Sequence, residues 1–86
     1  MAVTLTRTWN IEKPYDSGLI FCFVWEASDG RCGRSHYMSV YGAERIPEAE
    51  VMAEKNRMIA MRVEQIEKDL NRFEDYGKPP GHRTAA

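Results

Sequence analysis

The side chains in this sequence that could carry out redox or metal chemistry are two cysteines and a histidine. Cys22 and Cys32 flank a turn signal, Asp29-Gly30, and His36 follows shortly after Cys32. The turn predicts that the two cysteines lie on opposite faces of a sheet, which disfavours a disulfide. Cys32 and His36 would share one strand face at a separation of about 13 Å, too far for one metal ion. We therefore expect reduced thiols and no metal site.

General acid–base catalysis would require His36 to lie next to a carboxylate. Glu26 points away from His36 in the expected strand pairing, and Asp29 belongs to the turn. The stretch GRCGRS at residues 30–35 forms part of a hairpin and opens no helix, so it does not fit a phosphate-binding loop. We expect no catalytic residue, no cofactor and no enzymatic activity.

The composition is that of an ordinary globular domain. The 86 residues carry a formal net charge of -1, which leaves no overall field to attract nucleic acid or anionic lipid. A single core is only marginally sufficient at this length, so a partner is expected on energetic grounds. The N-terminal residues lack the pattern of a signal peptide, and no stretch approaches the roughly 18 apolar residues of a membrane-spanning helix. We therefore expect a cytoplasmic protein with no membrane partner.

The first half of the chain predicts three antiparallel strands, at about residues 3–11, 19–27 and 32–41. These segments are rich in threonine, aromatic and branched residues, and turn signals separate them. Asp29-Gly30 is typical of a two-residue type I′ turn, because both residue types tolerate positive φ. The register that follows pairs Ser28 with Arg31, Trp25 with Arg34, Phe23 with His36 and Phe21 with Met38.

In this register the sheet has one apolar face and one mixed face. The apolar face is expected to form the main core and contains Val3, Leu5, Trp9, Ile11, Leu19, Phe21, Phe23, Trp25, Met38 and Val40. The mixed face contains Thr4, Thr6, Thr8, Ile20, Cys22, Val24, Ser35, Tyr37, Ser39 and Tyr41. Only the middle strand is apolar there, so this face is either semi-exposed or a contact surface. The expected partner-binding residues are Ile20, Val24, Tyr37 and Tyr41.

Residues 47–76 predict one long helix. Pro47 suits the first helical position, Gly77 ends the pattern, and apolar residues recur at steps of three and four. Such a helix spans about 45 Å against about 30 Å for the strands, so its C-terminal part should extend past the sheet. We therefore expect a homodimer through the helix, with self-association residues Ile59, Val63, Ile66, Leu70 and Phe73. The alternative is a helix that bends or stops early and packs only on its own sheet.

The charges on the helix favour an antiparallel dimer. Basic side chains lie in the first half and acidic ones in the second half, namely Lys55 and Arg62 against Glu67, Asp69 and Glu74. Residues 77–86 are proline-rich, small and polar, and are expected to form a flexible tail. The expected fold class is therefore α+β, a three-stranded antiparallel β-meander followed by one long C-terminal helix (βββα), in a single domain of residues 1–76.

Two functions remain open at this level. The favoured one is a small non-catalytic interaction protein that binds a protein partner, such as a phage or mobile-element accessory protein that inhibits a bacterial defence system in the host cytoplasm. The alternative is a nucleic-acid-binding domain, because basic side chains lie near aromatic ones at one end of the predicted sheet. The residues for that alternative are Arg7, Arg31, Arg34 and His36.

Overall fold

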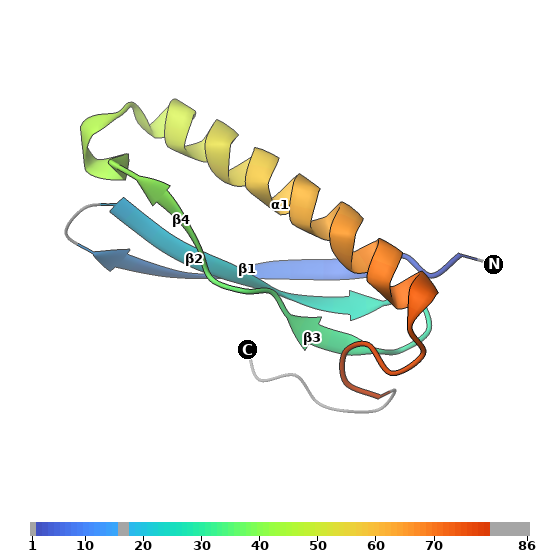
Figure 1. The fold of residues 1–86 in the computed structure, drawn as a ribbon. Coiled ribbons are helices and arrows are strands. Elements are labelled where there is room, and N and C mark those ends of the chain that lie inside the picture. Colours follow the sequence, from blue (N-terminus) through green and yellow to red (C-terminus); the bar gives the residue numbers. More distant parts are fainter. Residues whose placement is uncertain (1, 16–17, 80–86) are drawn as a thin grey trace.

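The computed structural model describes residues 2–15 and 18–79 and shows an antiparallel sheet followed by one long helix (Figure 1). This confirms the α+β class and the order of strands before helix. The elements are β1 (Leu5–Tyr15), β2 (Gly18–Ala27), β3 (Cys32–Arg34), β4 (Met38–Tyr41), the short 3₁₀ helix η1 (Ala43–Arg45) and α1 (Glu48–Arg72).

β2 lies at the centre of the sheet. β1 pairs with one side of β2, and β3 and β4 pair in succession with the other side. The strand predicted at residues 32–41 is thus divided in two around Ser35. The N–H of Phe23 donates to the hydroxyl oxygen of Ser35 at 2.9 Å, so a side chain replaces a backbone acceptor where the ladder is interrupted.

The turn after β2 differs from the predicted type I′ turn. The N–H of Gly30 donates to the carbonyl oxygen of Ala27 at 3.0 Å, and the N–H of Ala27 donates to that of Arg31 at 2.7 Å. Among the described residues only glycines have positive φ, 92° at Gly30, so Asp29 does not adopt the conformation that a type I′ turn needs. The loop is one residue longer than predicted.

The longer loop shifts the register of β3 by one residue. Val24 pairs with Arg34 and Trp25 with Gly33, so the predicted pairing of Trp25 with Arg34 is wrong. The predictions for Ser28 with Arg31 and for Phe23 with His36 fail for the same reason. The interruption between β3 and β4 contains one extra residue, and this residue offsets the register shift caused by the longer loop. The predicted pairing of Phe21 with Met38 is consequently confirmed.

A second irregularity lies in β1, where the register with β2 shifts between Leu5 and Arg7. Trp9 therefore pairs with Val24 and Ile11 with Cys22, on the face of the sheet opposite to Phe23 and Trp25. The prediction that Trp9 and Ile11 belong to the main core is wrong, and Thr8, predicted on the mixed face, lies on the helix side. A shift of one residue inverts the face of every following side chain.

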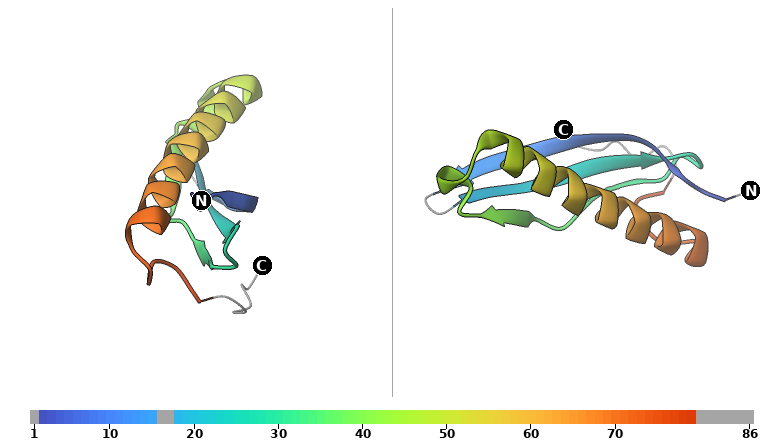
Figure 2. Two further views of the ribbon diagram at one scale, coloured as in Figure 1. Left: turned by 90° about the vertical axis from the view of Figure 1, so that its right-hand side faces the viewer. Right: turned by 90° about the horizontal axis from the view of Figure 1, so that it is seen from above.

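The core lies between β2 and the C-terminal half of α1. Its buried members are Phe23, Trp25 and Ala27 from the sheet and Ile66 and Leu70 from the helix. α1 crosses the sheet diagonally, and its C-terminal half supplies the buried helix residues of this core (Figure 2). The prediction that this end extends past the sheet and lacks cover is therefore wrong. The 25 residues of α1 span about 38 Å, and the N-terminal half lies beside β4.

The chain after α1 folds back on the hairpin. The helix ends at Arg72, four residues before the predicted limit, and the ring of Tyr76 stacks on Trp25 at 6.0 Å between centroids. The N–H of Lys78 donates to the carbonyl oxygen of Cys32 at 2.7 Å. The predicted flexible tail therefore begins too early, because Lys78 is held against β3. The remainder of that tail, residues 80–86, lies outside the described residues.

Candidate interaction surfaces

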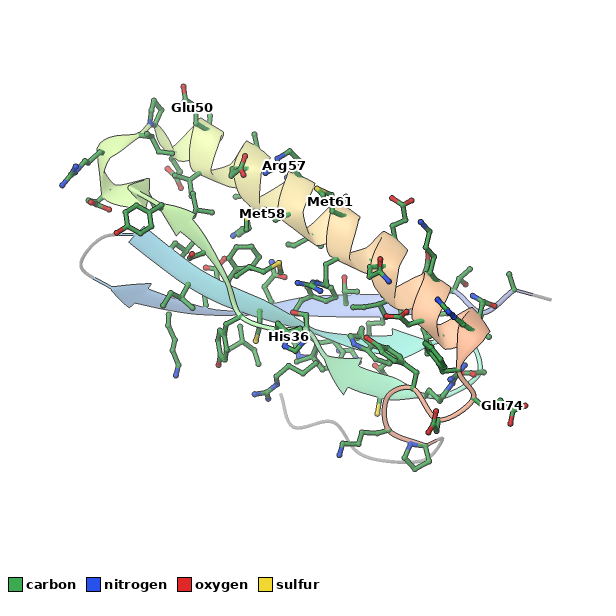
Figure 3. The ribbon with its side chains drawn as sticks, viewed as in Figure 1. His36, Glu50, Arg57, Met58, Met61 and Glu74 are labelled. Atoms are coloured by element: carbon green, nitrogen blue, oxygen red, sulfur yellow. The ribbon has the colours of Figure 1, made fainter. Side chains whose placement is uncertain are left out.

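The groups considered for redox and metal chemistry do not converge. Cys22 and Cys32 are both buried. Cys32 pairs with Glu26, so both cysteines lie on the helix-free face and the prediction of opposite faces is wrong. His36 is exposed and lies between β3 and β4 (Figure 3). In residues 2–15 and 18–79 no group of three or more His, Cys, Asp or Glu side chains could hold a metal ion.

Arg31 has a structural position that sequence reasoning missed. The residue is only 7% exposed, and its guanidinium donates to the carbonyl oxygens of Leu70 at 2.7 Å and Phe73 at 2.8 Å. Its Nε donates to a carboxylate oxygen of Asp29 at 2.6 Å. These bonds satisfy carbonyl groups that the last turn of a helix leaves without partners. Arg31 is therefore not available to bind phosphate.

The contact with Arg31 lowers the pKa of the Asp29 carboxyl. Desolvation raises the pKa of the Asp29 carboxyl, but the backbone N–H and the guanidinium of Arg31 together outweigh it. The net pKa lies below the ordinary value because both contacts favour the ionised form. The hairpin turn and the end of α1 thus share one charged contact.

The helix-free face of the sheet, called the outer sheet face below, is basic and aromatic. Arg7 lies 4.5 Å from the centre of the Trp9 ring, and the ammonium of Lys13 lies 5.7 Å from that of Tyr37. Arg34 is exposed on the same face, opposite Val24. The carboxylate on this face, Glu26, is ion-paired with Arg7 at 3.2 Å. Positive charge therefore predominates among the described strand residues of this face.

The structure separates the four predicted partner-binding residues. Tyr37 and Tyr41 are 48% and 79% exposed. Ile20 is half-buried, and Val24 is 0% exposed, so Val24 cannot contact a partner. Nε1 of Trp9 is also buried on this face and has no hydrogen-bond partner. The accessible groups are therefore the tyrosines and the basic side chains, and the aliphatic residues form their support.

The predicted self-association residues belong largely to the interior. Ile66 and Leu70 are each 2% exposed and pack in the chain's own core, with Ile59 and Val63 at its margin. Phe73 remains about half exposed. This seam as a whole is therefore not a free surface.

Two of the charges expected to guide dimer orientation also act within the chain. The ammonium of Lys55 is ion-paired with Glu12 of β1. A carboxylate oxygen of Glu67 accepts from the N–H of Leu5 at 2.7 Å. Both contacts fasten α1 to β1, which is a structural role.

A groove runs between β4 and the N-terminal half of α1, and sequence reasoning missed it. It consists of two adjoining open hollows of about 690 and 420 Å³ that share Arg57. Glu50, Arg57, Met58 and Met61 lie in that order along α1 (Figure 3). We call this hollow the α1–β4 groove. Its lining comprises Met38, Ser39, Val40, Tyr41, Ile46, Glu50, Ala53, Glu54, Arg57, Met58, Met61, Arg62 and Gln65.

Comparison with known proteins gives no match to a family model, to a curated protein or to a solved structure. In the described part of the chain, no helix combines the length and the apolar character that a membrane crossing needs. The class that the fold defines is a small α+β protein with a helix-covered sheet and one helix-free sheet face.

Proposed function

We propose that this chain is a non-catalytic protein-binding module and that its outer sheet face contacts an acidic surface of a protein partner. The observation that carries the proposal is the position of two exposed tyrosines on a sheet face whose accessible charges are mainly basic. Tyr37 has the ammonium of Lys13 over its ring, and Tyr41 is 79% exposed. Tyrosine rings bury a large area on binding at low entropic cost, and interface hot spots are enriched in tyrosine and arginine.

The support beneath these groups is rigid. Cys22 and Val24 are fully buried in the central strand, so the outer sheet face rests on close-packed atoms. A rigid support lowers the cost of ordering contact side chains when a partner binds. Arg7, Lys13 and Arg34 would draw an acidic partner toward this face and set its orientation.

The biological role that we propose is that of a phage or mobile-element accessory protein, for example an inhibitor that occupies a surface of a bacterial defence system in the host cytoplasm. The support is the one given by the sequence, a short chain whose residues favour contact over catalysis. Affinity capture from the native host would identify the partner.

The test compares two variants that carry the same change in net charge. Lys13→Glu with Arg34→Glu alters the outer sheet face, whereas Arg45→Glu with Lys68→Glu alters exposed residues elsewhere. We expect the first variant to bind the captured partner at least about tenfold more weakly, and the second to bind like the wild type. Equal binding by the wild type and the first variant would contradict the proposal. Far-ultraviolet circular dichroism checks that both variants fold.

Nucleic-acid binding by the same face is the second candidate. Basic side chains can bind the phosphate backbone while the neighbouring aromatic rings stack on bases. Arg7 on Trp9 and Lys13 on Tyr37 are the pairs that favour it. Arg31 does not belong to this set, for its side chain is buried against α1. Fluorescence anisotropy with labelled single-stranded and duplex oligonucleotides tests this candidate. Salt-dependent binding that Lys13→Glu with Arg34→Glu abolishes would favour it over an acidic protein surface.

A further inference from the structure

The α1–β4 groove has an ordered arrangement of charge. Glu50 and Glu54 line its N-terminal part, and Arg57 and Arg62 line its C-terminal part. Glu50 and Arg62 are separated by about 18 Å along the helix axis. The groove is therefore acidic at one end and basic at the other, with the change of sign near residue 56.

We propose that the α1–β4 groove is the contact through which two copies of this chain pair around a two-fold axis, with their α1 helices antiparallel. An axis perpendicular to α1 near residue 56 places Glu50 opposite Arg62 of the second copy. Glu54 and Arg57, between these two, are ion-paired with each other within one chain, so Glu50 and Arg62 carry the charge of the contact. In a two-fold interface each such contact occurs twice, so every unlike pair counts double.

Other orientations lose this complementarity. A parallel pair of helices would place Glu50 against Glu50 and Arg62 against Arg62, which is repulsive in both halves. The antiparallel pairing opposes unlike charges at both ends of the contact, where Glu50 and Arg62 lie. The charge order thus selects a second copy as the occupant, because the groove is complementary to itself.

Apolar side chains in the groove supply area for the contact. Met61 is 60% exposed, Met58 is half-buried beside it, and Met38 and Val40 of β4 line the floor. Unbranched methionine side chains adapt their shape to an opposing surface. The stretch of α1 from residue 50 to residue 65 offers about 24 Å of contact length. Among the described residues β4 pairs with β2 alone, so its outer edge also faces the proposed interface.

The size of such an interface is reasonable for this chain. A standard interface buries about 800 Å² on each partner, against a total accessible surface of 5984 Å² here. The buried core has few members, because a small domain buries little apolar surface by itself. Pairing of two copies would bury more. Tyr41 borders both surfaces, whereas Lys13, Arg34 and Tyr37 of the outer sheet face do not line the groove, so this inference does not rest on the proposed function.

The test is a charge exchange followed by sedimentation equilibrium. Glu50→Arg alone and Arg62→Glu alone each create two like-charge contacts, so each is expected to raise the dimer dissociation constant at least about tenfold. An equimolar mixture of the two single variants should form a heterodimer with near wild-type affinity, because both contacts are again between unlike charges. The double variant should also recover. Lys68→Glu, on the same helix outside the groove, is the control and should leave the dissociation constant unchanged.

Three outcomes would overturn the inference. They are a wild-type chain that stays monomeric up to high micromolar concentration, a dimer that neither single variant weakens, and single variants that do not pair when mixed. Each sample is checked by circular dichroism, and recovery in the mixture itself shows that both single variants are folded. These measurements use no ligand of the outer sheet face, so they succeed or fail separately from the proposed function.

Discussion

The guanidinium of Arg31 donates a 2.7 Å hydrogen bond to the carbonyl oxygen of Leu70, joining the hairpin turn to the last turn of α1. Further bonds from the same side chain reach the carbonyl oxygens of Phe73 and Glu74. Asp29 holds the guanidinium from the opposite side at 2.6 Å. One buried cation therefore fixes the end of the helix, the chain that follows it and the β2–β3 turn.

Replacement of Arg31 by alanine is expected to lower the free energy of unfolding by about 3 kcal/mol, because several buried carbonyl groups lose a charged donor. Arg31→Lys keeps the charge but not the planar set of donors, and should recover about half of that loss. Urea unfolding followed by circular dichroism measures both. The control is Arg45→Ala, whose side chain is exposed and pairs with Glu44 at 3.4 Å, with an expected change below about 0.5 kcal/mol. An equally small change for Arg31→Ala would contradict the assigned role.

The lowered pKa of Asp29 predicts a loss of stability in acid. The carboxylate stabilises the fold fully above its unfolded pKa, near 3.8, and that contribution is lost as the pH falls through the lower pKa of the folded state. Asp29→Asn should therefore be less stable than the wild type near neutral pH, and the difference should narrow below about pH 4. Urea unfolding at a series of pH values measures it. A difference that stays constant over this range would show that the contact with Arg31 does not depend on charge.

Leu70→Ala is expected to lower the free energy of unfolding by about 2–5 kcal/mol, because a buried side chain between β2 and α1 leaves a cavity. The loss should be the same at every protein concentration, since Leu70 belongs to the core of one chain. Met52→Ala, at an exposed position of the same helix, should change stability by less than about 0.5 kcal/mol. A loss confined to high protein concentration would instead place Leu70 in a contact between chains.

The ion pair between Lys55 and Glu12 links a largely buried ammonium to a carboxylate at the rim. Glu12→Ala leaves that ammonium without this partner and is expected to cost about 1–3 kcal/mol. Adding Lys55→Met removes the buried charge and should restore most of the loss. A double-mutant cycle measures the coupling, and the exposed pair Glu64 and Lys68, 3.5 Å apart, is the reference at about 0.3–0.5 kcal/mol. Equal coupling energies for the two pairs would show that burial does not strengthen the pair of Lys55 and Glu12.

Much of the architecture follows from local patterns in the sequence. The middle one of the three predicted strands, residues 19–27, is β2, the central strand of the sheet. The start of the helix at Pro47 was located within one residue. The sequence did not predict which side of the sheet each residue of β1 and β3 faces. The facing depends on irregularities at Thr6 and Ser35, which have no distinctive sequence signal.

The surfaces were predicted only in part. Tyr37 and Tyr41 are exposed as the interaction hypothesis requires, whereas Val24 and Leu70 are interior. The groove had a weak sequence signal, a second stripe at helical spacing through Glu50, Arg57 and Met61. That stripe becomes a groove only because α1 crosses the sheet diagonally, and a crossing angle depends on packing between distant segments.

The sequence by itself determined the class and order of the elements, because strand and helix periods and turn residues act over a few neighbouring positions. Tertiary structure decided which faces Trp9 and Cys32 occupy and that Arg31 binds the end of α1 instead of a phosphate. The physical reason is that side chains alternate with a period of two in a strand, so one added residue inverts a face. Contacts such as that between Arg31 and Leu70 join residues far apart in the chain, which no local pattern encodes.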